Sequence, residues 1–389
     1  MSHVASGKRS ERPSSGQSIP LRLGLKAGQW VEVRTKAEIL STLDRNARLE
    51  ELPFMPQMLR YCGRRFRVSK RAHKLCDTAY STGGRQMSDA VFLEDLRCDG
   101  EAYGGCEMRC LVLWKEAWLK PVDGAAGSSM PGVVPATPSG SDVAGHGACS
   151  EQSIYEATRD TAASAAASGT VYVCQATQLP QATQPLSRWN IGQYIEDYRS
   201  GNAGATEIVA GLLYLAYTNL VWSGVGFGAA LRWAYDLLQK VRGGSPYPAR
   251  LGQLPAKSRT PSVNLNLQVG ELVRVKDHRA ILATVDEQLM NRGMGFHPVM
   301  VPHCGKTFRV LQRAGRIMNE RTGQLMTLKN ECLVLDGADC LGRYTNPILC
   351  PRACYPYWRE IWLERVEPAS APSGQPADGT VRGEDKNQM

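Results

Sequence analysis

The sequence predicts an α+β protein in which two homologous, mostly β modules flank a helical middle segment. Residues 21–103 align with residues 263–345 without a gap, and residues 106–122 align with residues 350–366. Both halves contain short runs in which apolar and polar residues alternate, as they do in half-buried strands. Between the halves lies a region with helical periodicity and one long uncharged run.

Composition changes mark the boundaries of these parts. The polar N-terminal residues lack the apolar run of a secretory signal, so we expect a cytoplasmic protein with reduced thiols. The stretches on either side of the middle region are rich in Gly, Pro and small residues and are predicted to be linkers. The predicted parts are a disordered leader (1–20), the first module (21–122), a linker (123–148), the helical middle region (149–243), a linker (244–262), the second module (263–366) and a disordered tail (367–389).

Each module is predicted to begin with a strand that follows a glycine, GQWVEVR in the first and GELVRVK in the second. The pattern of AEILSTLD (37–44) then indicates a helix, and CGRRFRV (62–68) indicates a strand with Arg65 and Arg67 on one face. Residues 91–96 are predicted to form a further strand. The closing segment LWKEAWLKPV fits either a strand or a helix.

The G-x-x-V-x-V strand followed by a G-x-x-F-x-V strand resembles SH3-like barrels, in particular the β-subunit of nitrile hydratases and KOW-type modules. This resemblance covers about a third of each half and implies small SH3-like barrel modules. The AEILSTLD helix and the cysteines have no counterpart in such a barrel. The whole chain also resembles an uncharacterised bacterial family, which implies no activity.

Four cysteines recur at matched positions in the two halves. Four thiolates fit a tetrahedral zinc site that is closed to substrate, and a bound metal would add folding free energy to a small β module. We therefore predict two zinc sites, with an iron–sulfur cluster as the alternative metal centre and unliganded core cysteines or paired thiols as the metal-free interpretation. Cys76 and Cys332 are unmatched and are alternative ligands. The predicted ligands are Cys62, Cys98, Cys106 and Cys110, and Cys304, Cys340, Cys350 and Cys354.

The formal charge of +9 favours anionic partners. Basic side chains of the CGRRFRV strand and of its counterpart are candidates for contacts with the phosphates of nucleic acid. A solvated strand face is the commoner explanation of such a pattern. The candidate residues are Arg64, Arg65, Arg67 and Arg71, and Lys306, Arg309 and Arg313.

No catalytic residues are predicted. No histidine is matched between the halves, and no Gly-rich phosphate loop occurs. Glu116 and Glu360 are matched, and a structural ion pair or hydrogen bond is favoured for them over acid–base catalysis.

In the middle region, residues 208–231 carry no charge and are long enough to span a bilayer. Glycines at 224, 226 and 228 break this run, which favours a buried helical hairpin over membrane contact. The sequence thus favours a non-catalytic, metal-stabilised binding or scaffold protein for a protein or anionic partner. RNA binding through the basic strands and an iron–sulfur redox role are the alternatives.

Overall fold

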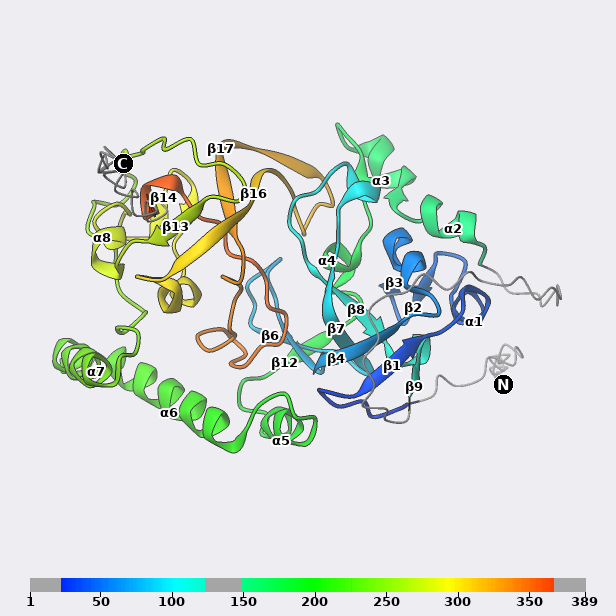
Figure 1. Ribbon diagram of the computed structural model, residues 1–389, viewed down its shortest axis with the longest axis horizontal. Helices are drawn as coiled ribbons and strands as arrows, with labels where there is room; N and C mark the ends of the chain where they lie inside the picture. The colour runs from blue at the N-terminus through cyan, green and yellow to red at the C-terminus, as the bar shows by residue number, and fades with distance from the viewer. Residues whose placement is uncertain (1–21, 123–148, 225, 367–389) are drawn as a thin grey trace, which may run out of the picture.

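The computed structural model describes residues 22–122, 149–224 and 226–366, so the predicted leader, first linker and tail lie outside the described residues. It combines helices with two half-barrel antiparallel sheets, which confirms the α+β class. Figure 1 shows the two sheets on opposite sides of the molecule, with helices of the middle region along one edge.

The first sheet is formed by strands that all lie in the first module. They are β1 (Trp30–Val33), β4 (Arg65–Arg71), β7 (Ala90–Arg97), β8 (Leu111–Lys115) and β9 (Leu119–Pro121), in the order β8-β7-β4-β1-β9. Val31 is paired with Phe66 on one side and with Pro121 on the other. Arg65 and Arg67 are exposed while Val68 is buried, so β4 alternates as predicted.

The second sheet is formed by β13 (Leu272–Val275), β16 (Thr307–Met318), β17 (Leu325–Leu335) and β18 (Leu363–Arg365), in the order β17-β16-β13-β18. Val273 is paired with Phe308 and with Arg365. These three residues are the aligned counterparts of Val31, Phe66 and Pro121. A single bridge between Leu333 and Trp358 takes the place of the β7–β8 pairing of Val91 with Trp114. Aligned positions therefore have the same register in the two sheets.

Short elements complete each module. The first contains α1 (Lys36–Leu40), β2 (Arg48–Leu49), β3 (Leu52–Pro53), η1 (Pro56–Tyr61), β5 (Lys74–Cys76), β6 (Gly84–Gln86), η2 (Glu101–Tyr103) and η3 (Glu116–Trp118). The second contains α8 (His278–Leu282), β14 (Met290–Asn291), β15 (Met294–Gly295), η4 (Pro298–His303) and η5 (Glu360–Trp362). Thr35 and Asp277 cap α1 and α8, because each side chain accepts a backbone N–H of the first turn.

The closing segment of the first module is neither one strand nor one helix. The β8 strand ends at Lys115, the 3₁₀ helix η3 follows, and β9 returns to the sheet. This turn allows both Trp114 and Trp118 to be fully buried. The indole N–H of Trp118 donates to Thr42 Oγ1 at 3.1 Å, and that of Trp362 donates to Thr284 Oγ1 at 3.0 Å. The two cores thus have the same hydrogen-bonded tryptophan.

The first half of the middle region packs on the first module. It contains α2 (Glu151–Glu156), β10 (Arg159–Asp160), α3 (Thr161–Ala166), β11 (Val171–Tyr172), α4 (Gln175–Gln178) and β12 (Gln184–Leu186). The β12 strand extends the β5–β6 hairpin to three strands. The buried side-chain amide of Gln175 accepts Leu113 N–H and donates to Leu113 O. The α4 helix therefore belongs to the hydrophobic core of the first module.

The second half of the middle region is a helical arm, which we define as α5 (Gly192–Arg199), α6 (Ala205–Val221) and α7 (Gly228–Arg242). It runs along the lower edge of the molecule in Figure 1. The expected hairpin is present, but the expectation that it is buried is wrong, because Val209, Leu213 and Leu220 are more than half exposed. None of the helices within the described ranges is long and apolar enough to cross a bilayer.

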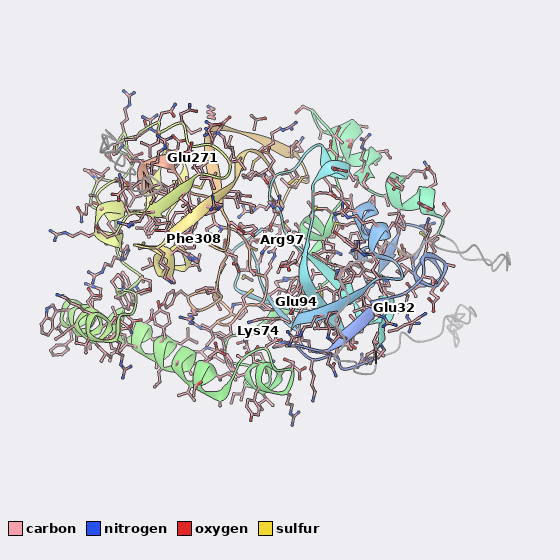
Figure 2. The ribbon with its side chains drawn as sticks, in the orientation of Figure 1. Glu32, Lys74, Glu94, Arg97, Glu271 and Phe308 are labelled. Carbon is pink, nitrogen blue, oxygen red and sulfur yellow. The ribbon has the colours of Figure 1, made fainter. Side chains whose placement is uncertain are left out.

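The two modules contact each other directly at what we call the junction. The carboxylate of Glu107 accepts the N–H groups of Gly315 and Arg316, both at 2.7 Å. The guanidinium of Arg97 stacks 4.0 Å from the ring centroid of Tyr355 and donates to Ala353 O. Figure 2 places Arg97 in the centre of the molecule, between the sheets.

Candidate functional site

The backbone brings two of the four predicted cysteines together in each module. Cys98 N–H donates to Cys110 O at 2.8 Å, and Cys340 N–H donates to Cys354 O at 2.9 Å. Cys62 follows η1, and the charged side chains nearest its thiol are those of Lys36 and Glu151. The pairing is equivalent in the two modules, but the complete four-cysteine set is gathered in neither.

The described residues contain no group of three or more His, Cys, Asp or Glu side chains arranged to hold a metal ion. Zinc needs four ligands, with sulfur about 2.3 Å from the metal. Burial raises the pKa of Cys98, Cys304 and Cys340 to about 12. The residues as placed do not form a zinc or cluster site, and the metal stays a prediction that metal analysis of the purified chain decides.

A sulfur contact that the sequence analysis missed lies at the junction. Cys76 Sγ is 2.7 Å from Cys350 Sγ, and Cys76 N–H donates to the same sulfur at 3.2 Å. The two residues are 274 positions apart and belong to different modules. The sequence analysis named Cys76 only as an alternative ligand, and the internal alignment, which matches Cys350 with Cys106, does not point to a contact between Cys76 and Cys350.

A buried arginine borders this contact. Arg352 donates to Cys76 O at 3.2 Å and forms an ion pair with Glu320 at 3.1 Å, and both charged side chains are 8 % exposed. Burial by itself raises the pKa of Cys350, but hydrogen bonds from Cys76 and the nearby guanidinium outweigh it and lower that pKa. The same hydrogen bond raises the pKa of Cys76. The hydrogen bond between the two sulfurs thus lowers the pKa of Cys350 and raises that of Cys76.

Arg352 also lines a cavity of about 40 Å³ with sulfur-rich walls. Its sulfur-bearing residues are Met55, Cys98, Cys106, Met108, Cys110, Cys174 and Met318. Arg352 and Met318 belong to the second module, so the cavity spans the junction. Burial raises the pKa of Cys174 to about 11, so the cavity offers neutral thiols and thioethers rather than thiolate ligands.

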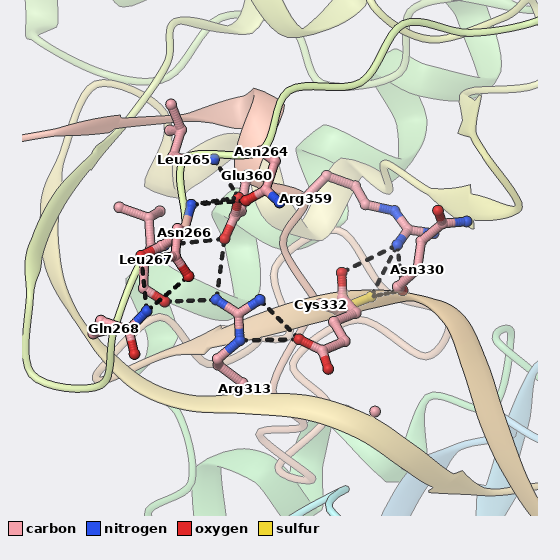
Figure 3. Close-up of polar contacts among 12 residues, drawn as sticks. Asn264, Leu265, Asn266, Leu267, Gln268, Arg313, Asn330, Cys332, Arg359 and Glu360 are labelled. Carbon is pink, nitrogen blue, oxygen red and sulfur yellow. Dashed lines mark hydrogen bonds and ion pairs between the residues drawn. The ribbon is translucent and has the colours of Figure 1, made fainter.

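The matched carboxylates have a structural role, as predicted. Glu116 accepts the N–H groups of Leu23, Gly24 and Leu25 at 2.7–2.9 Å, and it pairs with Arg71. Glu360 makes the same contacts in the second module, as Figure 3 shows for Leu265, Asn266, Leu267 and Arg313. Each carboxylate fixes the chain segment that enters its module. Their donors are all backbone amides or an arginine, which leaves no free proton acceptor for catalysis.

Intramolecular contacts occupy most of the candidate basic residues. Arg65 pairs with Glu32 at 3.3 Å, and Arg67 lies 3.7 Å from Glu94. Figure 2 labels Glu32 and Glu94 on the first sheet. The remaining contacts are those of Arg64 with the Phe66 ring, Arg71 with Glu116 and Glu196, Arg309 with Gly270 O, and Arg313 with Glu331 and Glu360. Lys306 is exposed. These contacts agree with a solvated strand face that is largely charge-balanced.

The helical arm carries large apolar side chains on its outer surface. On α7, Trp233 is 66 % exposed and Val241 is 81 % exposed, with Leu237 and Leu238 about half exposed. The inner side of the same helix carries Asp236, which accepts Tyr247 N–H and pairs with Arg250, and Tyr235, whose ring packs on that of Tyr247. Large apolar side chains of α7 are thus exposed, whereas an ordinary surface helix turns its apolar face to the core.

The exposed apolar surface continues over the other arm helices and the hairpin tip. Its members outside α7 are Trp189, Ile191, Ile195 and Tyr198 near α5, Val209, Leu212, Leu213 and Leu220 on α6, and Trp222 and Phe227 at the tip. Behind the hairpin, a cluster of tyrosines fixes the arm to the second module, with Tyr214 4.8 Å from Tyr344 between ring centroids. The sequence feature that corresponds to this surface is the uncharged run of residues 208–231. That run does not indicate which side of the helices is exposed.

Comparison of the chain with protein-family models, with curated proteins and with solved structures found no match.

Proposed function

We propose that this protein is a non-catalytic binding protein that attaches to an anionic lipid surface through its helical arm. The observation that carries the proposal is the outward apolar face of α7, continued by α6 and by the hairpin tip. Exposed apolar surface of this extent on a folded protein marks an interaction site. The two β modules, joined at the junction, form the body of the protein, and the arm attaches this body to the lipid surface.

A lipid surface fits the chemistry of the arm. Interfacial helices combine Trp, Phe and Leu on one face with Lys and Arg beside it. Trp222 and Phe227 project from the tip, and Lys240 and Arg242 are exposed near the end of α7. No ion pair among the described residues involves Arg232, Lys240 or Arg242, so their charges are available to anionic headgroups.

The body is proposed to derive from one duplicated module of SH3-like architecture. The ungapped alignment, the shared strand register and the repeated carboxylate contacts support this origin. RNA binding is less favoured, because carboxylates of the chain itself neutralise Arg65, Arg71 and Arg313.

Sedimentation of the full chain with vesicles tests the proposal. We expect binding to vesicles of phosphatidylcholine with phosphatidylserine and much weaker binding to phosphatidylcholine alone. Trp233→Gln should weaken binding by about tenfold to a hundredfold, because burying such a side chain contributes about 1.5–3 kcal/mol. Trp30→Gln is the matched control, since Trp30 is an exposed tryptophan on β1, away from the arm.

Charge and self-association are measured separately. Replacing Lys240 and Arg242 with glutamine should weaken binding about fivefold each, since a basic residue near an anionic surface contributes about 1 kcal/mol. Failure to bind either vesicle would overturn the lipid proposal. A concentration-dependent dimer in solution that Trp233→Gln dissociates would assign the arm to a second copy of the chain instead.

A further inference from the structure

Cys76 and Cys350 occupy facing positions on the two modules. Cys76 is the last residue of β5, and Cys350 lies in the loop that precedes η5. Their contact of 2.7 Å is the only sulfur–sulfur hydrogen bond found among residues 22–122, 149–224 and 226–366. Bond formation between these sulfurs needs little movement, because disulfides require close Cβ atoms and the sulfurs already touch.

The surroundings of Cys350 favour a nucleophilic sulfur. Its sulfur accepts both the thiol and the backbone N–H of Cys76, and the Arg352 guanidinium lies close by. A thiolate, not a thiol, attacks an oxidant. Two hydrogen-bond donors and a guanidinium surround Cys350 Sγ, so we expect Cys350, rather than Cys76, to attack the oxidant.

We propose that Cys76 and Cys350 are a redox-active pair that forms a reversible disulfide across the junction when the chain meets hydrogen peroxide. The Cys350 thiolate attacks one peroxide oxygen and releases hydroxide, which leaves a sulfenic acid. The Cys76 sulfur then attacks the sulfur of that sulfenic acid and, with loss of the Cys76 proton, releases water. The two thiols lose two electrons in total, and the peroxide is reduced to two waters. A small thiol restores both cysteines by exchange.

Access to the pair selects a small oxidant. Cys350 is 5 % exposed, while Cys76 is half-buried at the edge of the junction. Peroxide is small enough to reach such a sulfur, whereas a protein oxidant is not. The resulting bond would join the β5–β6 hairpin of the first module to the second module, beside the ion pair of Arg352 with Glu320. Oxidation thus converts a non-covalent contact between modules into a covalent one.

Peptide mapping of the full chain tests the proposal. The protein is treated with hydrogen peroxide, alkylated, and digested without reduction. We expect one linked species that contains the Cys76 and Cys350 peptides and is two hydrogens lighter than their sum. Reduction before alkylation should remove it. In Cys76→Ser the link should vanish, and the sulfenic acid on Cys350 should instead be trapped by dimedone.

Cys332→Ser is the matched control. Cys332 is also a buried cysteine of the second module beside an arginine, since Arg359 lies 3.4 Å from its sulfur, but it has no sulfur partner among the described residues. Its replacement should leave the Cys76–Cys350 link unchanged. A link from Cys350 to a different cysteine, or complete alkylation of Cys76 and Cys350 after peroxide has oxidised other cysteines, would overturn the proposal. These readouts do not depend on lipid binding.

Discussion

Replacing Glu116 with glutamine removes the charge of a fully buried carboxylate that holds the entry segment of the first module. Its Oε2 atom accepts the N–H groups of Leu23 and Gly24, and its Oε1 atom accepts Leu25 N–H and the Arg71 guanidinium. Glutamine keeps one acceptor oxygen and places an NH₂ group where the other oxygen was. Two of these four hydrogen bonds are therefore lost, whichever way the amide lies.

The loss of stability in Glu116→Gln follows from the burial of the carboxylate. A hydrogen bond to a charged group contributes about 1.5–3 kcal/mol, so losing two costs about 3–6 kcal/mol. Removing one partner of a buried ion pair costs about 3–5 kcal/mol, which agrees with that range. The Glu116 side chain is 0 % exposed and that of Arg71 is 13 % exposed. We expect Glu116→Gln to lower the free energy of unfolding by about 4 kcal/mol.

The chain supplies its own control in Glu360→Gln. Glu360 makes the equivalent contacts, but its side chain is 10 % exposed and that of its partner Arg313 is 33 % exposed. Water replaces part of the lost hydrogen bonding there, so we expect Glu360→Gln to lower the free energy of unfolding by about 2 kcal/mol. Urea unfolding measures the free energies, and hydrogen exchange of the amides of residues 23–25 and 265–267 locates the change. Equal losses for the two variants, or unchanged protection of residues 23–25, would refute the reasoning.

Two further predictions concern the pH dependence and the core. Burial lowers the pKa of His278 to about 4, so the unfolded chain binds this proton at a higher pH than the folded chain does. Stability should therefore fall as the pH drops from about 6.5 to 4, by about 3 kcal/mol in total, and acid titration of unfolding should show a smaller fall in His278→Gln. Trp118→Phe and Trp362→Phe each remove an indole hydrogen bond, to Thr42 and Thr284 respectively. Each should lower the unfolding free energy by about 1 kcal/mol or more, and a midpoint shift in only one variant would contradict the equivalence of the two cores.

The parts of the fold that follow from local pattern could be predicted. Alternation placed Arg65 and Arg67 on the outer face of β4, and the internal alignment anticipated the matching registers around Val31 and Val273. The closing segment stayed ambiguous because Trp114 and Trp118 are both apolar at a spacing that suits a helix face and a strand face. The observed 3₁₀ turn between two strands buries both tryptophans. Neither the helical nor the strand period describes such a turn.

The candidate site depended on contacts between segments far apart in the chain. Cys76 meets Cys350 only because the two modules touch, and an alignment of one module with the other does not contain that information. The exposure of Trp233 and Val241 was likewise hidden, because an uncharged run looks the same whether protein or solvent covers it. The sequence pattern of a helix or strand shows which of its faces is apolar. Which residues cover that face depends on tertiary packing.

The junction joins the modules through unlike surfaces, and this has a consequence for assembly. Glu107 of the first module binds Gly315 and Arg316 of the second, whose aligned counterparts in the first module are His73 and Lys74. Head-to-tail contacts of this kind do not close on themselves, so like units can add without limit. In the first module, however, α5 covers His73 and Lys74 through Gln193 O and the carboxylate of Asp197. The α5 helix of the arm thus covers the surface of the first module that corresponds to the one Glu107 binds on the second, much as terminal repeats cover the ends of solenoids.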